Sequence, residues 1–445
     1  MFKNMPWMVS RRRLLLLSII DYSIIISTFL ILENLRIINT NFLSINILAI
    51  FWIITSYTLD KYSIVDDEID NKFTSKFLRT CKAYIITGIL FKIIIIIFSF
   101  LKSDVGDGKW FIFLSIISSL SFLYEISHNF LVNKYITNRI NWISIYSNST
   151  NGSLLEHIKE VKKHGFYKSI HKSKLKELKN LNNKKIGFIL EDINILSDEE
   201  KKILIDLKNE GFSLFSLIDW LERYLHRYPA EIISSENIIR VLLINKKSNT
   251  SKRIKRISEF ILSLFLLIIT APIVLLISIF IKIEDRGPIL YSQKRSGFAG
   301  QIFTIYKLRT MKINAEKHGI KWSSENDKRV TKIGKFLRMT RLDELPQLIS
   351  VLKGDMSLIG PRPERPEIEK MLITKISNYK LRYLVRPGIS GWAQVSYPYG
   401  ASIEDTKMKL SYDIYYIKNF STLFDFLILL ETIRLVFNFR GSNPK

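Results

Sequence analysis

Long apolar runs separated by charged stretches occupy the first third of the chain. The runs are about Leu14–Leu32, Phe42–Thr58, Ala83–Leu101 and Phe111–Ile126. Because a helix needs roughly 20 mostly apolar residues to cross a bilayer, the pattern predicts four transmembrane helices within residues 1–138. The third run is the clearest, although it contains Lys92, and the fourth is short.

The charges between these runs predict how the helices are oriented. Arg11–Arg13 and the basic residues between the second and third runs lie on one side, and few basic residues lie on the other. The positive-inside rule therefore places the N-terminus and everything after the fourth helix in the cytoplasm. Asp21 lies within the first run. It is either a functional charge or, as is commoner near the cytosolic end of a helix, a paired or hydrated one.

Residues 139–250 change to a pattern of short apolar runs that alternate with polar helical ones. Two strands and two helices are expected, at Trp142–Ser147, Leu154–Lys163, Lys185–Leu190 and Ser197–Asn209. Such alternation predicts a small, parallel, Rossmann-like α/β domain in the cytoplasm. The turn after the first strand contains one glycine, Gly152, whereas a dinucleotide site needs three. We therefore expect a structural or regulatory domain that binds no cofactor.

The apolar run Phe260–Ile281 is uncharged and long enough to span a membrane. Two features favour a re-entrant helix over about 259–283 instead. Pro272 lies in the middle of the run, where it removes a helix hydrogen bond and bends the chain. Both flanks are also basic, which suits two ends on the same cytoplasmic face. A kinked transmembrane span is the alternative that hydropathy leaves open.

Composition agrees with a membrane protein. The 445 residues are 47% apolar and carry a formal charge of +25, which suits soluble parts that face an anionic leaflet or bind phosphorylated substrates. Nucleic acid is not expected, because the apolar runs argue against it and the sequence has no zinc-finger or RNA-binding signature. Cys81 is the single cysteine, so neither an intramolecular disulfide nor a cysteine metal cluster is predicted.

Two adjacent carboxylates, Asp343 and Glu344, follow a cation-rich segment that includes Arg338 and Arg341. Such a pair alone is weak evidence, because most are solvated surface charges. Cations nearby would bind phosphate and keep Asp343 ionised. An ionised carboxylate among phosphate-binding cations can attack phosphorus or hold a hard cation such as Mg²⁺.

Several further motifs occur in order around this pair. They are Gln293-Lys-Arg-Ser-Gly297, Lys307-Leu-Arg309, Leu342-Asp343-Glu344-Leu-Pro346, Gly360-Pro361-Arg362-Pro363 and Gly388-Ile-Ser-Gly-Trp-Ala-Gln394. Over residues 251–445 the chain resembles the bacterial sugar transferases, which are monotopic polyprenyl-phosphate hexose-1-phosphate transferases. The preceding helices and α/β domain resemble the long-form members that begin exopolysaccharide, capsule or O-antigen synthesis. The resemblance implies a mostly α catalytic domain that carries the re-entrant helix.

The resemblance also implies a reaction and a set of residue roles. A sugar-1-phosphate would pass from a UDP-sugar to undecaprenyl phosphate, with release of UMP, on the cytoplasmic face of the bacterial inner membrane. Asp343 would be the nucleophile that forms a covalent phosphosugar intermediate, and Glu344 would help to hold Mg²⁺. The substrate and phosphate-binding positions would be Lys307, Arg309, Arg338, Pro361, Arg362, Pro363, Asp413 and Asp425, the last two with roles that the resemblance does not assign.

The chain departs from the family pattern in two places. Glu259 stands where the membrane segment usually has Asp, and Ala271 precedes Pro272 where Ser is common. A catalytically silent scaffold and a polytopic transporter are the competing functions. The intact carboxylate pair argues against the first, and the motif-rich last 160 or so residues argue against the second. The sugar is not specified, with UDP-glucose and UDP-galactose as the leading expectations, and a homodimer through the extra domains is a further one.

Overall fold

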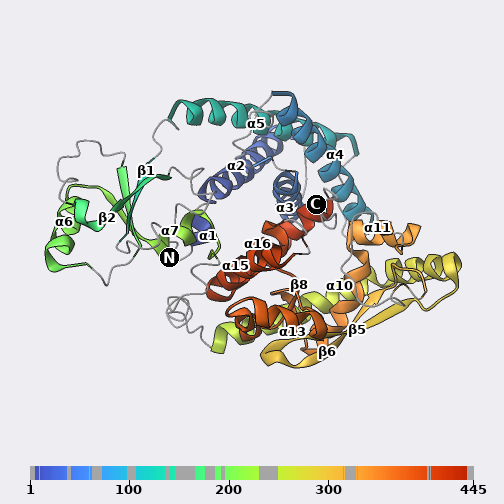
Figure 1. Ribbon diagram of the computed structural model, residues 1–445. Helices are drawn as coiled ribbons and strands as arrows, with labels where there is room; N and C mark the ends of the chain where they lie inside the picture. Colours follow the sequence, from blue (N-terminus) through green and yellow to red (C-terminus); the bar gives the residue numbers. More distant parts are fainter. Residues whose placement is uncertain are drawn as a thin grey trace. The chain divides into compact units, whose positions relative to one another are not determined.

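The structure is a computed structural model, and it describes most of the chain (Figure 1). The described residues are 6–9, 11–37, 42–59, 61–62, 73–97, 107–135, 140–146, 166–175, 186–191, 196–229, 249–313, 315, 327, 329–397, 400 and 402–437. The chain divides into two compact units, Met1–Asn141 and Trp142–Lys445. Each unit is described by itself.

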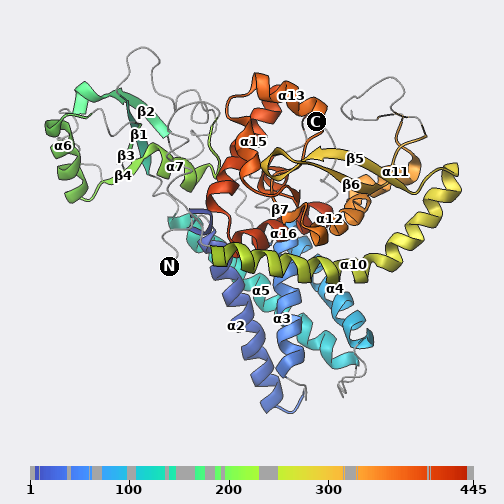
Figure 2. The ribbon, with the colours of Figure 1, turned by 90° about the horizontal axis from the view of Figure 1, so that it is seen from below.

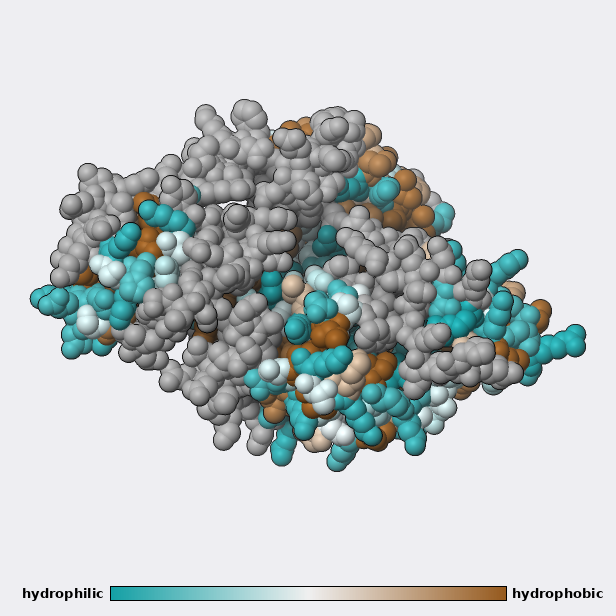
Figure 3. All heavy atoms as spheres, viewed as in Figure 1, coloured by the Kyte–Doolittle hydropathy of each residue, from teal (hydrophilic) through white to brown (hydrophobic). Residues whose placement is uncertain are grey.

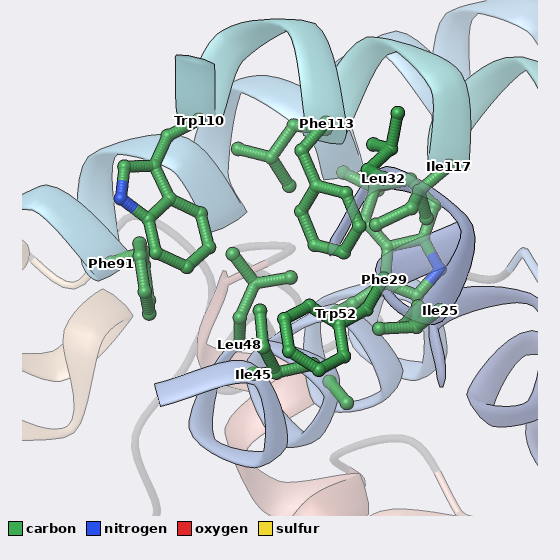
Figure 4. Close-up of a cluster of buried hydrophobic side chains, with 13 residues drawn as sticks. Ile25, Phe29, Leu32, Ile45, Leu48, Trp52, Phe91, Trp110, Phe113 and Ile117 are labelled. Carbon is green, nitrogen blue, oxygen red and sulfur yellow. The ribbon is translucent and has the colours of Figure 1, made fainter. Parts of the chain in front are cut away.

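Apolar helices make up the first unit. They are α1 (Pro6–Val9), α2 (Arg12–Asn34), α3 (Phe42–Thr58), α4 (Phe73–Ile97) and α5 (Asp107–Tyr135). Helices α2 to α5 contact one another around a buried cluster in which Trp52 and Phe113 pack among aliphatic side chains (Figure 4). Hydrophobic side chains also gather on the outer surface of α4 (Figure 3). The unit therefore has an apolar interior and an apolar exterior, as a helix bundle in lipid has.

Three helices among the described residues are long and apolar enough to cross a membrane. They are Leu14–Asn34 within α2, Trp110–Ser127 within α5 and Thr250–Asp285, while Phe42–Thr58 is a shorter apolar helix. The third predicted span corresponds to α4, but its last residues, 98–101, lie outside the described residues. The chain thus has several apolar helices, as expected of a membrane protein. A bundle of four spans stays a prediction.

Asp21 is one of the buried polar residues of the first unit. Its Oδ2 accepts hydrogen bonds from the Trp52 indole at 3.0 Å, from Lys61 Nζ at 3.1 Å and from the Tyr62 hydroxyl at 2.6 Å. Asp21 and Lys61 are each less than 5% exposed. The sequence left open whether Asp21 is functional or paired, and the structure shows that it is paired.

The second unit begins with a parallel sheet. Its strands are β1 (Asn141–Tyr146), β2 (Phe166–His171), β3 (Ile186–Leu190) and β4 (Ser213–Ser216), in the order β2-β1-β3-β4. The pairs β1–β2 and β3–β4 are parallel. Helix α6 (Asp198–Asn209) begins with a capping box in which Ser197 and Glu200 bond each other's backbone N–H. Helix α7 (Leu217–Tyr224) follows β4 directly.

The predictions for this segment are confirmed for both strands and for the second helix, within one or two residues at each end. The first predicted helix, Leu154–Lys163, and the turn that contains Gly152 lie outside the described residues. The Rossmann-like assignment and the expected lack of a cofactor therefore stay predictions.

Helix α10 (Asn249–Asp285) is a single helix of 37 residues with Pro272 inside it. Figure 2 shows that the ribbon changes direction about midway along this helix, which is the expected effect of an interior proline. Most of its apolar side chains are exposed, with Ile268 at 63% and Leu275 at 68%. Pro272 therefore bends the helix without interrupting it. A re-entrant path through a membrane stays a prediction.

The remaining elements surround the central 3₁₀ helix η6 (Leu342–Gln347). Two strands, β5 (Leu290–Ser296) and β6 (Ile302–Leu308), form an antiparallel hairpin, with η5 (Phe298–Gly300) at its tip. The other elements are α11 (Lys332–Thr340), α12 (Leu348–Lys353), β7 (Ser357–Ile359), α13 (Pro366–Lys375), η7 (Tyr379–Leu384), β8 (Gly388–Ser390), α14 (Trp392–Ser396), α15 (Ile403–Asn419) and α16 (Thr422–Phe437). Helix η6 contacts β6, α10, α11 and α12, so it lies at the centre of this part of the unit.

Candidate active site

The Asp343-Glu344 pair lies in η6, and both side chains are buried, at 8% and 6% exposed. Helix α11 ends at Arg341, which adopts a left-handed conformation with φ of 56°. This residue stops the α-helix and turns the chain into η6, in which Pro346 lies two residues after Glu344. The local sequence therefore turns both carboxylates away from solvent. An ionised carboxylate that is buried without a partner is unstable, so this pair needs compensating charges nearby.

Three cations surround Glu344. Lys307 Nζ, from the end of β6, lies 3.0 Å from Oε1. Arg362 donates to both carboxylate oxygens, with its Nη1 at 3.3 Å from Oε2. Arg341 Nη1 lies 3.8 Å from Oε2. Residues from three separate segments of the sequence thus converge on one carboxylate and make a strongly positive site.

The two adjacent carboxyl groups have pKa values that move in opposite directions. Burial, helped by the negative charge of Glu344, raises the pKa of Asp343 to about 6, although Lys307 and Arg362 oppose the rise. Burial also acts to raise the pKa of Glu344, but the charges of Arg362 and Lys307 prevail and hold it well below its ordinary value. Glu344 is therefore a permanent anion, while Asp343 changes its charge near neutral pH. Such a divergence is typical of catalytic carboxylate pairs.

The loop Pro361-Arg362-Pro363 is fixed through its backbone by two other arginines. Arg382 Nη2 donates to the carbonyl oxygen of Arg362 at 2.7 Å, and Arg295 Nη1 donates to that of Pro363 at 2.9 Å. The loop is therefore held from η7 on one side and from β5 on the other. This fixes the main chain from which the Arg362 guanidinium reaches Glu344.

Asp413 supports this loop indirectly. It is 2% exposed in α15, and its Oδ2 accepts a hydrogen bond from Arg382 Nε at 2.9 Å. Burial raises the pKa of Asp413, and the charge of Arg382 opposes the rise. Asp413 was expected to bind substrate or phosphate. That role stays a prediction, and in this structure the Asp413 carboxylate orients the arginine that holds the Arg362 backbone.

Two of the predicted phosphate-binding cations make other contacts. Arg309 pairs with Asp285 at the end of α10. Gly287 makes room for that pair, because a Cβ added there would lie 1.9 Å from the Arg309 guanidinium. Arg338 Nε donates to the Thr310 hydroxyl at 3.0 Å, and its charge acts to lower the pKa of Asp343. The structure thus brings Arg338 toward the carboxylate pair, while Arg309 joins the end of β6 to the end of α10.

Asp425 holds the first half of α10. Its Oδ2 lies 2.6 Å from Lys255 Nζ, and its Oδ1 accepts a hydrogen bond from the Tyr416 hydroxyl at 2.7 Å. Lys255 also lies 3.3 Å from Glu259, the residue at which the chain departs from the family pattern. Glu259 therefore retains the charge that this cluster uses. Asp425 was expected among the substrate and phosphate-binding positions without an assigned role, and that stays a prediction. Its contacts in this structure anchor the apolar helix to the folded part of the unit.

The donor chemistry around Asp343 and Glu344 suits Mg²⁺ only when phosphate is also present. Among the described residues no group of three or more His, Cys, Asp or Glu side chains could hold a metal ion. Mg²⁺ is commonly held by one or two carboxylates together with substrate phosphates and water. Two adjacent carboxylates at a cation-rich site fit that arrangement, with Glu344 as the ionised member.

Several residues of this site had no specific role in the prediction. Arg341 was expected only as one of the basic residues that would bind phosphate, and Gln394 lies within a quoted motif, so both positions carried a signal in the sequence. Lys255 lies four residues before Glu259, in the stretch compared with the family pattern, whereas Arg382 carried no signal by itself. Arg382 and Lys255 each contact an acid that is more than 30 residues away in sequence, Asp413 and Asp425 respectively, and only the fold brings these residues together.

Comparisons with known proteins identify the family to which the C-terminal part of the chain is similar. The profile of the family described as bacterial sugar transferase matches residues 250–439. The chain is 44% identical over 189 residues to the UDP-N-acetylgalactosamine-undecaprenyl-phosphate N-acetylgalactosaminephosphotransferase of Aeromonas hydrophila, covering 42% of this chain and 45% of that protein. It is also 36% identical over 188 residues to the UDP-glucose:undecaprenyl-phosphate glucose-1-phosphate transferase of Escherichia coli K12, covering 42% and 40%.

A shorter relative is matched over most of its length. The chain is 39% identical over 181 residues to the UDP-glucose:undecaprenyl-phosphate glucose-1-phosphate transferase of Caulobacter vibrioides, covering 40% of this chain and 68% of that protein. The chain belongs to the bacterial sugar transferase family. The match spans less than half of the length of the Aeromonas and Escherichia relatives.

Proposed function

We propose that this chain transfers a sugar-1-phosphate from a UDP-sugar to undecaprenyl phosphate and releases UMP. The observation that carries the proposal is a buried Asp343, with a pKa of about 6, beside a Glu344 that is held by Lys307, Arg341 and Arg362. This arrangement combines a carboxylate that can attack phosphorus with fixed positive charge for phosphate oxygens. The names of the relatives supply the acceptor, undecaprenyl phosphate, and the sugar nucleotide class.

In the first step the Asp343 carboxylate attacks the phosphorus atom that bears the sugar. The bond from that phosphorus to the bridging oxygen breaks, UMP leaves with that oxygen, and an aspartyl phosphosugar remains. Phosphoryl transfer of this kind depends on in-line positioning and charge neutralisation more than on acid–base chemistry. The cations now on Glu344 would supply that neutralisation.

In the second step an oxygen of undecaprenyl phosphate attacks the same phosphorus. The bond to Asp343 breaks, which regenerates the carboxylate and leaves a lipid-linked diphosphosugar. A covalent intermediate separates the two transfers, so that the nucleotide leaves before the lipid arrives. Mg²⁺ held by Glu344 and phosphate oxygens would add positive charge against the diphosphate.

We further propose that α10 enters the cytoplasmic leaflet of the bacterial inner membrane and returns to the same face. Exposed apolar side chains on both sides of Pro272, the bend in the helix and basic residues at both flanks support this path. Cysteines introduced at Lys252 and Arg286, in a chain with Cys81 replaced by serine, would test it with a membrane-impermeant thiol reagent. Labelling of both from the cytoplasmic side is expected, and labelling from opposite sides would establish a span.

The reaction itself is tested with purified protein, Mg²⁺, undecaprenyl phosphate and a panel of UDP-sugars that includes UDP-glucose, UDP-galactose and UDP-N-acetylgalactosamine. UMP release is the measured product. The account predicts release with at least one sugar and none from Asp343→Asn. Asp355→Asn is the matched control, because Asp355 is an exposed carboxylate shortly after α12. An absence of UMP with every sugar would refute the proposed function.

A further inference from the structure

Gln394 contacts two of the three cations that surround Glu344. Its Oε1 accepts hydrogen bonds from Arg341 Nη1 at 2.9 Å and from Arg362 Nη1 at 3.3 Å. Its Nε2 donates to the carbonyl oxygen of Ile389 at 3.3 Å. A guanidinium has donors only and a carbonyl only accepts, so these partners determine which way the amide faces. One carboxamide oxygen therefore links two guanidinium groups that come from different loops.

The same two guanidinium groups also contact Glu344. Arg362 Nη1 lies 3.3 Å from Glu344 Oε2 and Arg341 Nη1 lies 3.8 Å from it. Both groups thus lie between a charged acceptor, Glu344, and a neutral one, Gln394. A neutral acceptor orients a cation without cancelling its charge, which leaves the positive field available to an incoming anion.

The element that carries Gln394 is itself held in place. Helix α14 begins at Trp392, which is 4% exposed. The indole Nε1 of Trp392 donates to the carbonyl oxygen of His226 at 2.9 Å. The Arg362 backbone is fixed by Arg382. The backbones that carry Gln394 and Arg362 are therefore both held in place. The Arg362 side chain is restrained at its backbone by Arg382 and at its guanidinium group by Gln394.

We propose that Gln394 is a positioning residue for the donor's diphosphate. It holds Arg341 and Arg362 so that their guanidinium groups face the phosphate oxygens, and it does so without neutralising them. This inference rests on the proposed function, because it assumes that a nucleoside diphosphate group binds beside Glu344. It assigns to Gln394 an effect on donor binding and little direct effect on the chemical step.

Two substitutions separate orientation from charge. Gln394→Met removes the acceptor with little change in size. Gln394→Glu keeps an acceptor but adds a negative charge that competes with phosphate. Gln301→Glu is the control, because Gln301 is an exposed glutamine in the hairpin and its substitution makes the same change in net charge. Binding of UDP by calorimetry, the KM and kcat for UMP release and the melting temperature are measured for each.

Both Gln394 variants should bind UDP more weakly and show a raised KM, Gln394→Glu by about tenfold or more, with a smaller change in kcat. Added salt should reduce the difference in UDP affinity between the two variants, since it screens the introduced charge. The control should match the wild type. Gln394→Glu keeps an acceptor for both arginines, so it decides the question even where Gln394→Met fails to fold.

Wild-type affinity for UDP in Gln394→Glu would overturn the inference. The inference would also be overturned if both variants lost UDP binding and their melting temperatures fell by the same amount, since that result indicates a purely structural role. The proposed function fails separately, through an absence of UMP release by the wild type. In that case weaker UDP binding by the variants would still support the positioning role.

Discussion

Asp343→Asn should abolish transfer and also stabilise the fold. Burial raises the pKa of this carboxyl from 3.8 to about 6, so the folded protein binds the proton more tightly than the unfolded chain does. Each unit by which the pKa rises corresponds to about 1.4 kcal/mol of free energy that the ionised form costs relative to the protonated form. Ionised Asp343 therefore costs the fold about 3 kcal/mol above pH 6, while below pH 4 the carboxyl is protonated in both states and the cost disappears.

An asparagine at this position has no charge to bury, so the gain in stability should follow the same pH dependence. In thermal unfolding of the purified protein at pH 7.5 the variant should melt on the order of 5–10 °C higher than the wild type. The difference should shrink toward zero as the pH falls to 4. Asp355→Asn, at an exposed carboxylate, should show no such difference. A variant that is less stable than the wild type at pH 7.5 would refute the argument that burial of Asp343 is costly.

Three further predictions follow from the buried charges of this unit. The kcat/KM for UMP release should fall about tenfold per pH unit below pH 6, because Asp343 must be ionised to attack; a flat profile between pH 5 and 7 would contradict this. Asp413→Asn should raise the KM for the UDP-sugar and lower the melting temperature, because Arg382 loses the partner that orients it; unchanged values of both would contradict its positioning role. Glu222→Gln should lower the free energy of unfolding by about 3 kcal/mol in denaturant, since it leaves Lys418 buried without its ion pair. Adding Lys418→Met should recover much of that loss. An unchanged free energy of unfolding in Glu222→Gln would contradict the importance of the pair.

Much of the fold was predictable because it depends on local pattern. The strands β1 and β3 coincide with short apolar runs, and α6 begins at a Ser-x-x-Glu capping box that is visible in the sequence. The position of the bend in α10 could be predicted from Pro272 for the same reason. Whether that bend returns the chain to one face of a membrane depends on the lipid, which no local pattern contains.

The site was predictable to the extent that its motifs are contiguous. Asp343, Glu344, Lys307 and Arg362 come together as the ordered motifs indicated. The partners of Arg309 and of Asp413 could not be predicted, because each depends on a contact between distant segments. Arg309 meets the end of α10, and Asp413 meets a 3₁₀ helix that no motif marks. The presence of a charged residue in a motif therefore indicated that it matters without indicating which residue it contacts.

The covalent intermediate is the central claim, and one measurement tests it most directly. Purified protein is incubated with Mg²⁺ and a UDP-sugar that supports UMP release, without undecaprenyl phosphate, and is then analysed by intact-mass and peptide mass spectrometry. The account predicts a mass gain of one sugar-1-phosphate on the peptide that contains Asp343, lost when undecaprenyl phosphate is added and absent from Asp343→Asn. A full turnover with lipid but no adduct at any time, or an adduct on another residue, would contradict it.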